Sequence, residues 1–256
     1  MASYFIYDSI NQYRSDNTVS EGQMTDSATP TFSASDTLTS HERSSDQNIG
    51  TIISGVADRD AIEYAVGSSV TANAAAVYFT GDDNVSSGTI MNFFVDTDRA
   101  SLPNKGTITA VSAAGWATTD LTETTGTKFF VEFTGAVTNV SEVLIGSKLS
   151  FEVEPDVNIQ SSIDYENSVQ KSLGGVEYVL NVNPGQEVTT IGFQNISSTF
   201  KTNLTTMQDA LKGEAKKFVW YDGSSFHWVR LDKPMTFTEI ADGRFSTQLV
   251  LRQQIQ

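Results

Sequence analysis

Alternating apolar and polar residues predict β-strands along most of the chain. The clearest stretch is residues 217–251, where aromatic and β-branched residues lie between two turn signals, Asp222-Gly223 and Asp242-Gly243. Asp-Gly between alternating apolar runs is typical of a tight hairpin turn. We therefore expect consecutive β-hairpins here, with both faces of the first one, residues 218–229, carrying apolar or aromatic side chains.

Shorter alternating runs fill the first part of the chain. They lie at residues 61–66, 74–80, 89–95, 107–111, 128–134, 143–145 and 148–153. Gly-, Asp- and Ser-rich turns separate them at intervals of roughly ten to fifteen residues, which favours an antiparallel sandwich or jelly roll. In the run 128–134, Phe129, Val131 and Phe133 share one face, and we expect that face to be core.

One segment, residues 199–212, has the periodicity of an amphipathic helix. Its apolar face consists of Phe200, Leu204, Met207 and Leu211. Ser198 can cap its start, and Gly213 can end it in the left-handed conformation. Burial of each apolar side chain would contribute about 1.5–3 kcal/mol before entropy is subtracted. We expect this helix to cover one face of the sheet formed by residues 217–251, whose other face then needs a second cover.

Composition shifts along the chain indicate three parts. Residues 1–30 have an aromatic cluster followed by a polar stretch, which predicts an N-terminal arm that is ordered against a neighbour or else a frayed terminus. Residues 31–155 are expected to form the β-sandwich domain. The segment Glu152-Val-Glu-Pro-Asp156 marks its end, because proline stops a central strand. Residues 156–256 then form a smaller α+β domain, so the predicted fold class is mostly β (α+β).

Charge and cysteine content exclude several classes of partner and site. The chain has 16 Lys and Arg against 31 Asp and Glu, a net charge of −15, which disfavours nucleic acid and anionic membranes as partners. It has no cysteine, so no disulfide or thiolate chemistry is available. The first residues carry no signal-peptide pattern, and no window of about 18 apolar residues occurs, so we expect a protein made in the cytoplasm.

Candidate chemistry is sparse. The two histidines, His41 and His227, have no partners placed beside them in the sequence, and nucleophile-elbow and phosphate-loop motifs are absent. The loop Asp96-Thr-Asp98 is a weak Ca²⁺ candidate, and solvated turn residues are the preferred interpretation of Asp96 and Asp98. The sequence therefore predicts neither an enzyme nor a cofactor.

The segment Val137–Phe151 resembles the last strands of a galactose-binding-like, or discoidin-like, jelly roll. The continuation, about residues 130–256, resembles structural proteins of tailed-bacteriophage virions, especially tail-associated ones. The motifs that carry this resemblance are Glu154-Pro-Asp156, Ser172-Leu-Gly-Gly175, Phe193-Gln-Asn-Ile-Ser197, Trp220-Tyr-Asp-Gly223 and Trp228-Val-Arg-Leu231. The first third departs from sugar-binding jelly rolls, since it lacks Trp-bearing early strands.

This resemblance implies a non-enzymatic structural subunit of a tailed-phage virion, in the tail or the head-to-tail neck, assembled in the host cytoplasm. Its partners would be other virion proteins and copies of itself in a ring. The expected interface residues are Tyr4, Phe5, Tyr7, Trp220, Tyr221, Phe226, Trp228 and Arg230. The aromatic residues among them also fit sheet core or a sugar-stacking platform. The alternative function is accordingly a carbohydrate-binding adhesion module that contacts host surface glycans.

Overall fold

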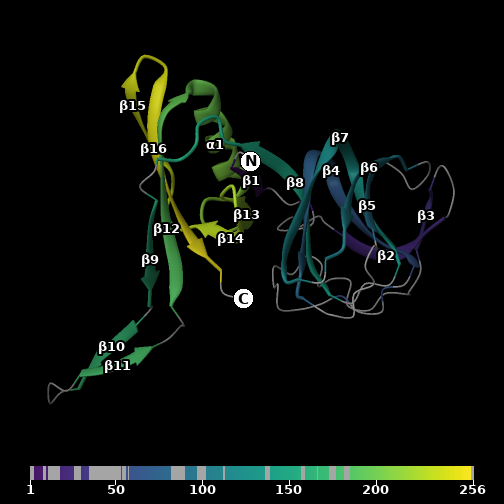
Figure 1. Cartoon of the computed structure of the whole chain (residues 1–256), viewed down its shortest axis with the longest axis horizontal. Helices are drawn as coiled ribbons and strands as arrows, with labels where there is room; N and C mark the ends of the chain where they lie inside the picture. The colour runs from purple at the N-terminus through teal and green to yellow at the C-terminus, as the bar shows by residue number, and fades with distance from the viewer. Residues whose placement is uncertain are drawn as a thin grey trace. The chain divides into compact units, whose positions relative to one another are not determined.

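Long β-strands paired antiparallel make up most of the computed structural model (Figure 1). The structure describes residues 3–7, 10, 18–25, 30–34, 53, 56, 58–81, 90–96, 102–111, 113–135, 139–156, 159–165, 167–172, 177–181 and 185–254. The chain divides into an N-terminal unit, Phe5–Leu149 with Gln256, and a C-terminal unit, Met1–Tyr4 with Ser150–Ile255. The predicted mostly β fold is confirmed. Within the described ranges, no helix is both long and apolar enough to cross a membrane.

Two long strands organise the N-terminal unit. β4 (Asp58–Phe79) and β7 (Gly115–Thr134) pair antiparallel along nearly their whole length, with register shifts that include one between Ala65 and Val70. Each strand was expected as one or two short runs. They form continuous strands because polar residues in the middle of each still pair across the ladder, although they carry no apolar pattern that would reveal it.

Shorter strands extend both halves of this pair. The first half of β4 pairs with β2 (Thr18–Met24), which pairs in turn with β3 (Phe32–Ala34). The second half of β4 pairs with β8 (Val140–Ser150). The second half of β7 pairs with β5 (Ile90–Asp96), and β5 pairs with β6 (Asn104–Thr109). β4 and β7 thus contribute to two layers, which is the predicted sandwich.

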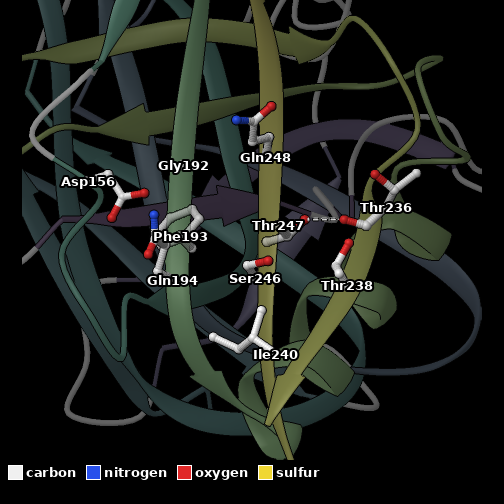
Figure 2. A pocket seen from close by; sticks show the side chains of 10 residues that line it. All are labelled: Asp156, Gly192, Phe193, Gln194, Thr236, Thr238, Ile240, Ser246, Thr247 and Gln248. Carbon is white, nitrogen blue, oxygen red and sulfur yellow. Dashed lines mark hydrogen bonds between the residues drawn. The ribbon is translucent and has the colours of Figure 1, made fainter.

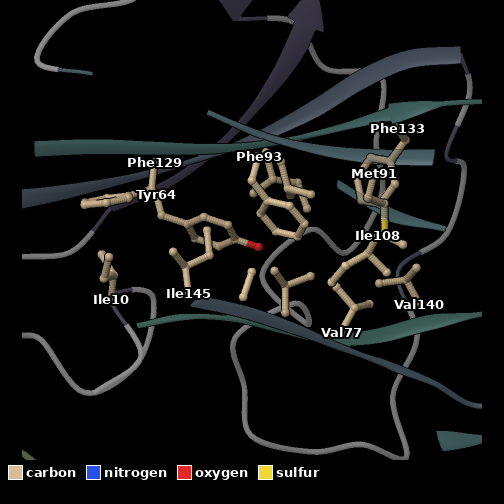
Figure 3. Packing of buried hydrophobic residues seen from close by; sticks show 14 of the residues in the cluster. Ile10, Tyr64, Val77, Met91, Phe93, Ile108, Phe129, Phe133, Val140 and Ile145 are labelled. Atoms are coloured by element: carbon tan, nitrogen blue, oxygen red, sulfur yellow. The ribbon is translucent and has the colours of Figure 1, made fainter. Parts of the chain in front are cut away.

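The main core of this unit lies between the two layers. Figure 3 shows Phe93, Phe129 and Phe133 extending toward Val77 and Ile145, and all five side chains are buried. The predicted core face of residues 128–134 is confirmed. Alternation along each strand therefore places a continuous set of large apolar side chains on the inner faces.

The opposite face of the same strands carries a second, smaller core. Its members are Met24, Phe32, Ala61, Phe94, Leu102 and Phe130. The rings of Phe32 and Phe130 lie 5.3 Å apart between centroids. Two consecutive phenylalanines, Phe129 and Phe130, are therefore both fully buried, on opposite sides of β7. Only one buried face was expected, because the cover supplied by β3 and Leu102 comes from segments distant in sequence.

A buried carboxylate ties several of these strands together. Glu132 on β7 is 1% exposed; it accepts a hydrogen bond from Arg59 Nη1 at 2.6 Å and another from Asn92 Nδ2 at 2.8 Å. Asn104 Nδ2 donates to Asn92 Oδ1 at 3.0 Å. Arg59 has φ +69°, an uncommon conformation for a residue with a side chain, next to a register shift in β4. The network joins β4, β5, β6 and β7.

Truncation of Glu132 should destabilise the protein. Glu132→Ala leaves Arg59 and Asn92 without their buried acceptor, and we expect a loss of about 2–3 kcal/mol in the free energy of unfolding. Urea denaturation measures this loss. Glu123→Ala is the matched control, because Glu123 lies exposed on the same strand. Equal losses for the two variants would contradict the proposed role of the network.

The C-terminal unit is built on a second antiparallel sheet. Its central strand β12 (Gln186–Ser197) pairs with β16 (Arg244–Gln253) on one side and with β9 (Gln160–Asp164) on the other. β16 also pairs with β15 (Thr236–Ala241) and, near its end, with β14 (Phe226–Leu231). β12 thus lies between two neighbouring strands, β9 and β16.

Three further elements complete this unit. β13 (Lys217–Tyr221) pairs with β14 in the hairpin that the first Asp-Gly signal predicts. Among the described strands, β10 (Asn167–Lys171) and β11 (Glu177–Asn181) pair only with each other, and this ribbon extends beyond β9 and β12 (Figure 1). β1 (Tyr4–Tyr7) is divided, with Tyr4 in this unit and Phe5 in the other.

The predicted helix is present as α1 (Ser198–Ala210), directly after β12. The N-cap is Ser197, one residue earlier than expected, and its Oγ accepts a hydrogen bond from the backbone N–H of Phe200 at 3.1 Å. Gly213 has φ +67°, the left-handed conformation predicted for it. All four predicted apolar residues are buried, and α1 packs on β12 and β16.

Candidate functional site

The sheet of β15, β16, β12 and β9 has two chemically different faces. Ile191, Phe193 and Leu249 point toward α1 and are buried. Because side chains alternate along a strand, the residues between them point to the opposite face. Gly192 of β12 is paired with Gln248 of β16 there. That face is polar.

A groove runs across this polar face (Figure 2). It has a volume of about 400 Å³ and is lined by Asp156, Gly192, Phe193, Gln194, Thr236, Thr238, Ile240, Ser246, Thr247 and Gln248. An adjoining hollow of about 690 Å³ shares four of these residues and adds Gln160, Thr190, Lys233 and Val250. We call the two together the polar groove. The pairing of β15 with β16, which places Thr238 opposite Ser246, supplies one side of it.

The absence of a side chain at Gly192 shapes the middle of the groove. The backbone N–H of Asp156 donates to the carbonyl oxygen of Gly192 at 2.8 Å. A Cβ added at Gly192 would lie 2.8 Å from Asp156 Oδ2, closer than such atoms approach. Glycine is therefore needed for the Asp156 carboxylate to rest over the bare backbone of β12.

A β-bulge lies next to this glycine. The register between β12 and β16 shifts between Phe193 and Ile196, and Asn195 has φ +60°. Its carbonyl oxygen accepts a hydrogen bond from Arg244 Nη1 at 3.3 Å. Bulges commonly redirect a side chain at a binding site. Here Gln194, at the start of the bulge, is exposed and lines the groove.

The lining of the polar groove is mostly uncharged. Amides come from Gln160, Gln194 and Gln248, and hydroxyls come from Thr190, Thr236, Thr238 and Ser246. Among the described lining residues, the ionisable side chains are Asp156 and Lys233. The described lining therefore consists mainly of neutral hydrogen-bonding groups, with one carboxylate and one ammonium group among them. Its chemistry is suited to binding.

An ionic cluster lies farther along the same face of β16. Arg252 Nε donates to Asp232 Oδ1 at 2.6 Å, and Arg252 Nη2 donates to Asp164 Oδ2 at 2.8 Å. The hydrogen bond to Asp232, followed by the interaction with Asp164, raises the pKa of Arg252 in spite of its burial. Its third contact is with Gln186 Oε1, 3.3 Å from Nη1. The positive charge of Arg252 is therefore paired with two carboxylates of the chain, those of Asp164 and Asp232.

None of the predicted interface residues is among the described residues that line the groove. Phe5, Trp220, Tyr221 and Trp228 are buried within the chain, and Tyr4, Tyr7, Phe226 and Arg230 are half-buried. The ring of Tyr4 lies 5.0 Å from that of Tyr221 and 6.5 Å from that of Phe226. We expected one face of the first hairpin to have no contacts within the chain. Tyr4 packs against Tyr221 and Phe226 of that hairpin. An interface role for these residues stays a prediction.

The other sequence candidates can be placed only in part. Asp96 is the last residue of β5, and Asp98 and His41 lie outside the described residues. Across the described ranges, no group of three or more His, Asp or Glu side chains is arranged to hold a metal ion. His227 packs its ring against Trp220, 4.8 Å between centroids, and its Nε2 lies 3.0 Å from Asp222 Oδ2. His227 therefore stabilises the β13–β14 turn through its contact with Asp222.

Sequence reasoning did not identify the polar groove. Its residues come from four separate segments, and their polar character resembles that of any solvated strand face. One signal was present: Gly192 interrupts an otherwise regular strand pattern, and a glycine inside a strand often marks a bulge or a close backbone approach. Both occur here.

No family model and no curated protein matches this chain. Among solved structures, it is similar to the CBM32 of AlyQ in complex with 4,5-unsaturated mannuronic acid: identity is 21%, TM-score 0.34, and coverage 44% of this chain and 85% of that one. It is also similar to the family 32 CBM from Clostridium perfringens NanJ in complex with galactose, at 12% identity and TM-score 0.38, covering 57% of this chain and 99% of that one.

Truncated AlyQ with CBM32 and alginate lyase domains is a further similar structure, at 17% identity and TM-score 0.40. The match covers 88% of this chain and 56% of that one. At these identities and TM-scores, the similarities assign neither a function nor a ligand to this chain.

The β13–β14 turn should make stability depend on pH in acid. Burial raises the pKa of Asp222, but hydrogen bonds from Ser225 N, His227 and Ser224 outweigh it and lower the pKa to about 2. A carboxyl group with a lowered folded-state pKa stabilises the protein above its ordinary pKa of 3.8. That contribution is lost as pH falls from about 4 through about 2.

The variant Asp222→Asn tests this dependence. We expect it to lose about 1 kcal/mol of stability at pH 7, after allowance for solvent screening, and to flatten the decline between pH 4 and pH 2. Thermal unfolding across this pH range measures both effects. Asp242→Asn, in the second Asp-Gly turn, is the control. An unchanged acid limb in Asp222→Asn would contradict the assignment.

Proposed function

We propose that this protein is a non-enzymatic binding protein whose polar groove takes a carbohydrate. One observation carries the proposal: a groove of about 400 Å³ whose exposed face is lined mainly by uncharged amides and hydroxyls. Each of these groups can donate and accept hydrogen bonds. A sugar presents a dense row of hydroxyl donors and acceptors, which is the complement of such a lining.

Other ligand classes fit the polar groove less well. A phosphate-bearing ligand needs cationic partners. Lys233 is the one cation among the described lining residues. The nearby Arg252 is already paired with Asp232 and Asp164. An apolar ligand would find mainly Ile240 and Val250. The net charge of −15 further disfavours polyanions.

Binding should be weak for a single sugar chain. Phe193 contributes to the groove wall, but its ring is 1% exposed and packs toward Phe151 and Phe200 on the core side. Aromatic stacking therefore contributes little to affinity at the described lining. Hydrogen bonds exchanged with water give a small net gain each, so we expect a Kd on the order of 0.1–1 mM.

The proposal is tested by glycan screening at millimolar concentration, followed by titration of the best ligand by NMR. Gln248→Ala and Thr238→Ala each remove one exposed groove group, and we expect each to weaken binding about five-fold or more. Gln253→Ala is the matched control, because Gln253 lies on β16 outside the groove. A screen without ligands, or equal affinities for all variants, would contradict carbohydrate binding.

A second candidate function is a structural subunit of a tailed-phage virion, as the sequence resemblance implies. The observation that favours it is the β9–β11 region. Ile159, Ile163 and Tyr165 are exposed in or beside the edge strand β9, and the two-stranded β10–β11 ribbon pairs with no other strand in the described part of the chain. Isolated two-stranded ribbons are marginally stable in water. Neighbouring subunits that cover this region would supply the missing contacts.

Assembly is tested by light scattering coupled to size-exclusion chromatography on the full chain. Ile163 is 61% exposed, so Ile163→Asp should leave folding intact while reducing the mass of the assembly. Ile240→Asp is a matched control, since Ile240 is 53% exposed but lines the polar groove. A wild-type chain that stays monomeric at all concentrations, and is missing from purified particles, would contradict the structural role.

A further inference from the structure

We infer that Asp156 determines the specificity of the polar groove, and that it selects neutral sugars with two adjacent free hydroxyl groups over acidic sugars. The inference rests on the proposed carbohydrate function. It assigns a chemical class of ligand to one named carboxylate.

Asp156 is held in place by backbone contacts. Pro155 precedes it and restricts the chain, and its own N–H is bonded to the Gly192 carbonyl at 2.8 Å. Figure 2 shows its side chain beside β12, next to Gly192 and Gln194. A binding group that is already oriented loses little entropy when a ligand arrives. The carboxylate is therefore a preorganised acceptor.

The carboxylate of Asp156 also differs from those of Asp164, Asp222 and Asp232 in this unit. Asp164 and Asp232 are bonded to Arg252, and Asp222 is bonded to its own turn. Within the described part of the chain, no hydrogen bond is made to either Oδ atom of Asp156, and the side chain is half-buried. Both oxygens are therefore available to a ligand in the groove.

Two carboxylate oxygens side by side match two adjacent hydroxyl groups of a pyranose ring. Each hydroxyl donates to one oxygen, and hydrogen bonds to a charged acceptor are stronger than those between neutral groups. The exposed amides of Gln194 and Gln248 can then bond the remaining ring and hydroxyl oxygens. The arrangement recognises a vicinal diol.

The same carboxylate disfavours acidic sugars. A uronic acid carries a negative charge, which would meet that of Asp156. The nearby guanidinium of Arg252 is already paired, so Lys233, in the adjoining hollow, is the remaining cation among the described lining residues. Like charges brought together in a partly desolvated site oppose binding. Specificity here therefore includes a repulsive element as well as the attractive one.

The test uses the full-length protein and three probes: a neutral oligosaccharide with free vicinal hydroxyls, its uronic-acid counterpart, and its amino-sugar counterpart. NMR titration or calorimetry gives each affinity for wild type and for Asp156→Asn, which keeps the shape and removes the charge. We expect Asp156→Asn to weaken binding of the neutral probe about ten-fold. We also expect it to improve relative binding of the uronic-acid probe several-fold.

Gly192→Ala is the second variant, because its Cβ would lie 2.8 Å from Asp156 Oδ2 and would therefore push the carboxylate out of place. We expect the same loss of the neutral probe, with circular dichroism and thermal unfolding as the check on folding. Asp209→Asn, on α1 away from the groove, is the control for a changed net charge. It should leave all three affinities as in wild type.

The outcomes separate the two proposals. If wild type binds none of the probes and no glycan in the screen, carbohydrate binding itself is wrong. If wild type binds the neutral probe and Asp156→Asn binds it equally well, only the role of Asp156 is overturned. Tighter binding of wild type to the amino-sugar probe than to the neutral one would overturn the diol assignment, since the carboxylate would then be selecting a cation.

Discussion

The antiparallel pairing of β12 with β16 is the constraint on which the C-terminal unit depends. It places Ile191 opposite Leu249 on one face and Gly192 opposite Gln248 on the other. The first face is closed by α1, which begins where β12 ends. The second stays open to solvent, and β15 and β9 widen it into a groove. A shift of this register by one residue would exchange the faces, exposing the core and burying polar side chains. The pairing of β12 with β16 thus determines both the core under α1 and the candidate site on the opposite face.

In the N-terminal unit, apolar side chains are buried on both faces of the same strands. β4 and β7 run through two layers, so that one pair of strands lines a large core on its inner side and a small one on its outer side. The outer side also holds Glu132 with Arg59 and Asn92. Buried polar groups are tolerated where every partner is satisfied, and here the partners come from neighbouring strands. The N-terminal unit thus combines two apolar cores with a buried polar network, while the polar groove lies on the other unit.

Local patterns in the sequence predicted local elements well. The helix appears within two residues of its predicted ends, because capping, periodicity and Gly213 act over one or two turns. The hairpin of β13 and β14 appears where Asp222-Gly223 predicts it, because a turn fixes its own geometry. The two runs predicted within β4 were wrong as separate strands. The residues between them resemble a turn, but the strand continues through them, and pairing with β7 resumes at Val70.

The sequence by itself determined which faces are apolar, where the helix and the hairpins lie, and a net charge of −15 that disfavours polyanionic partners. Only the tertiary structure decided that Asp156, Gly192 and Gln248, from separate segments, meet in one groove, and that Trp220 and Trp228 are buried in the chain. The physical reason is that alternation and propensity act between near neighbours. Sheet register and packing are set by contacts between distant segments, and their energies depend on partners that no local pattern specifies.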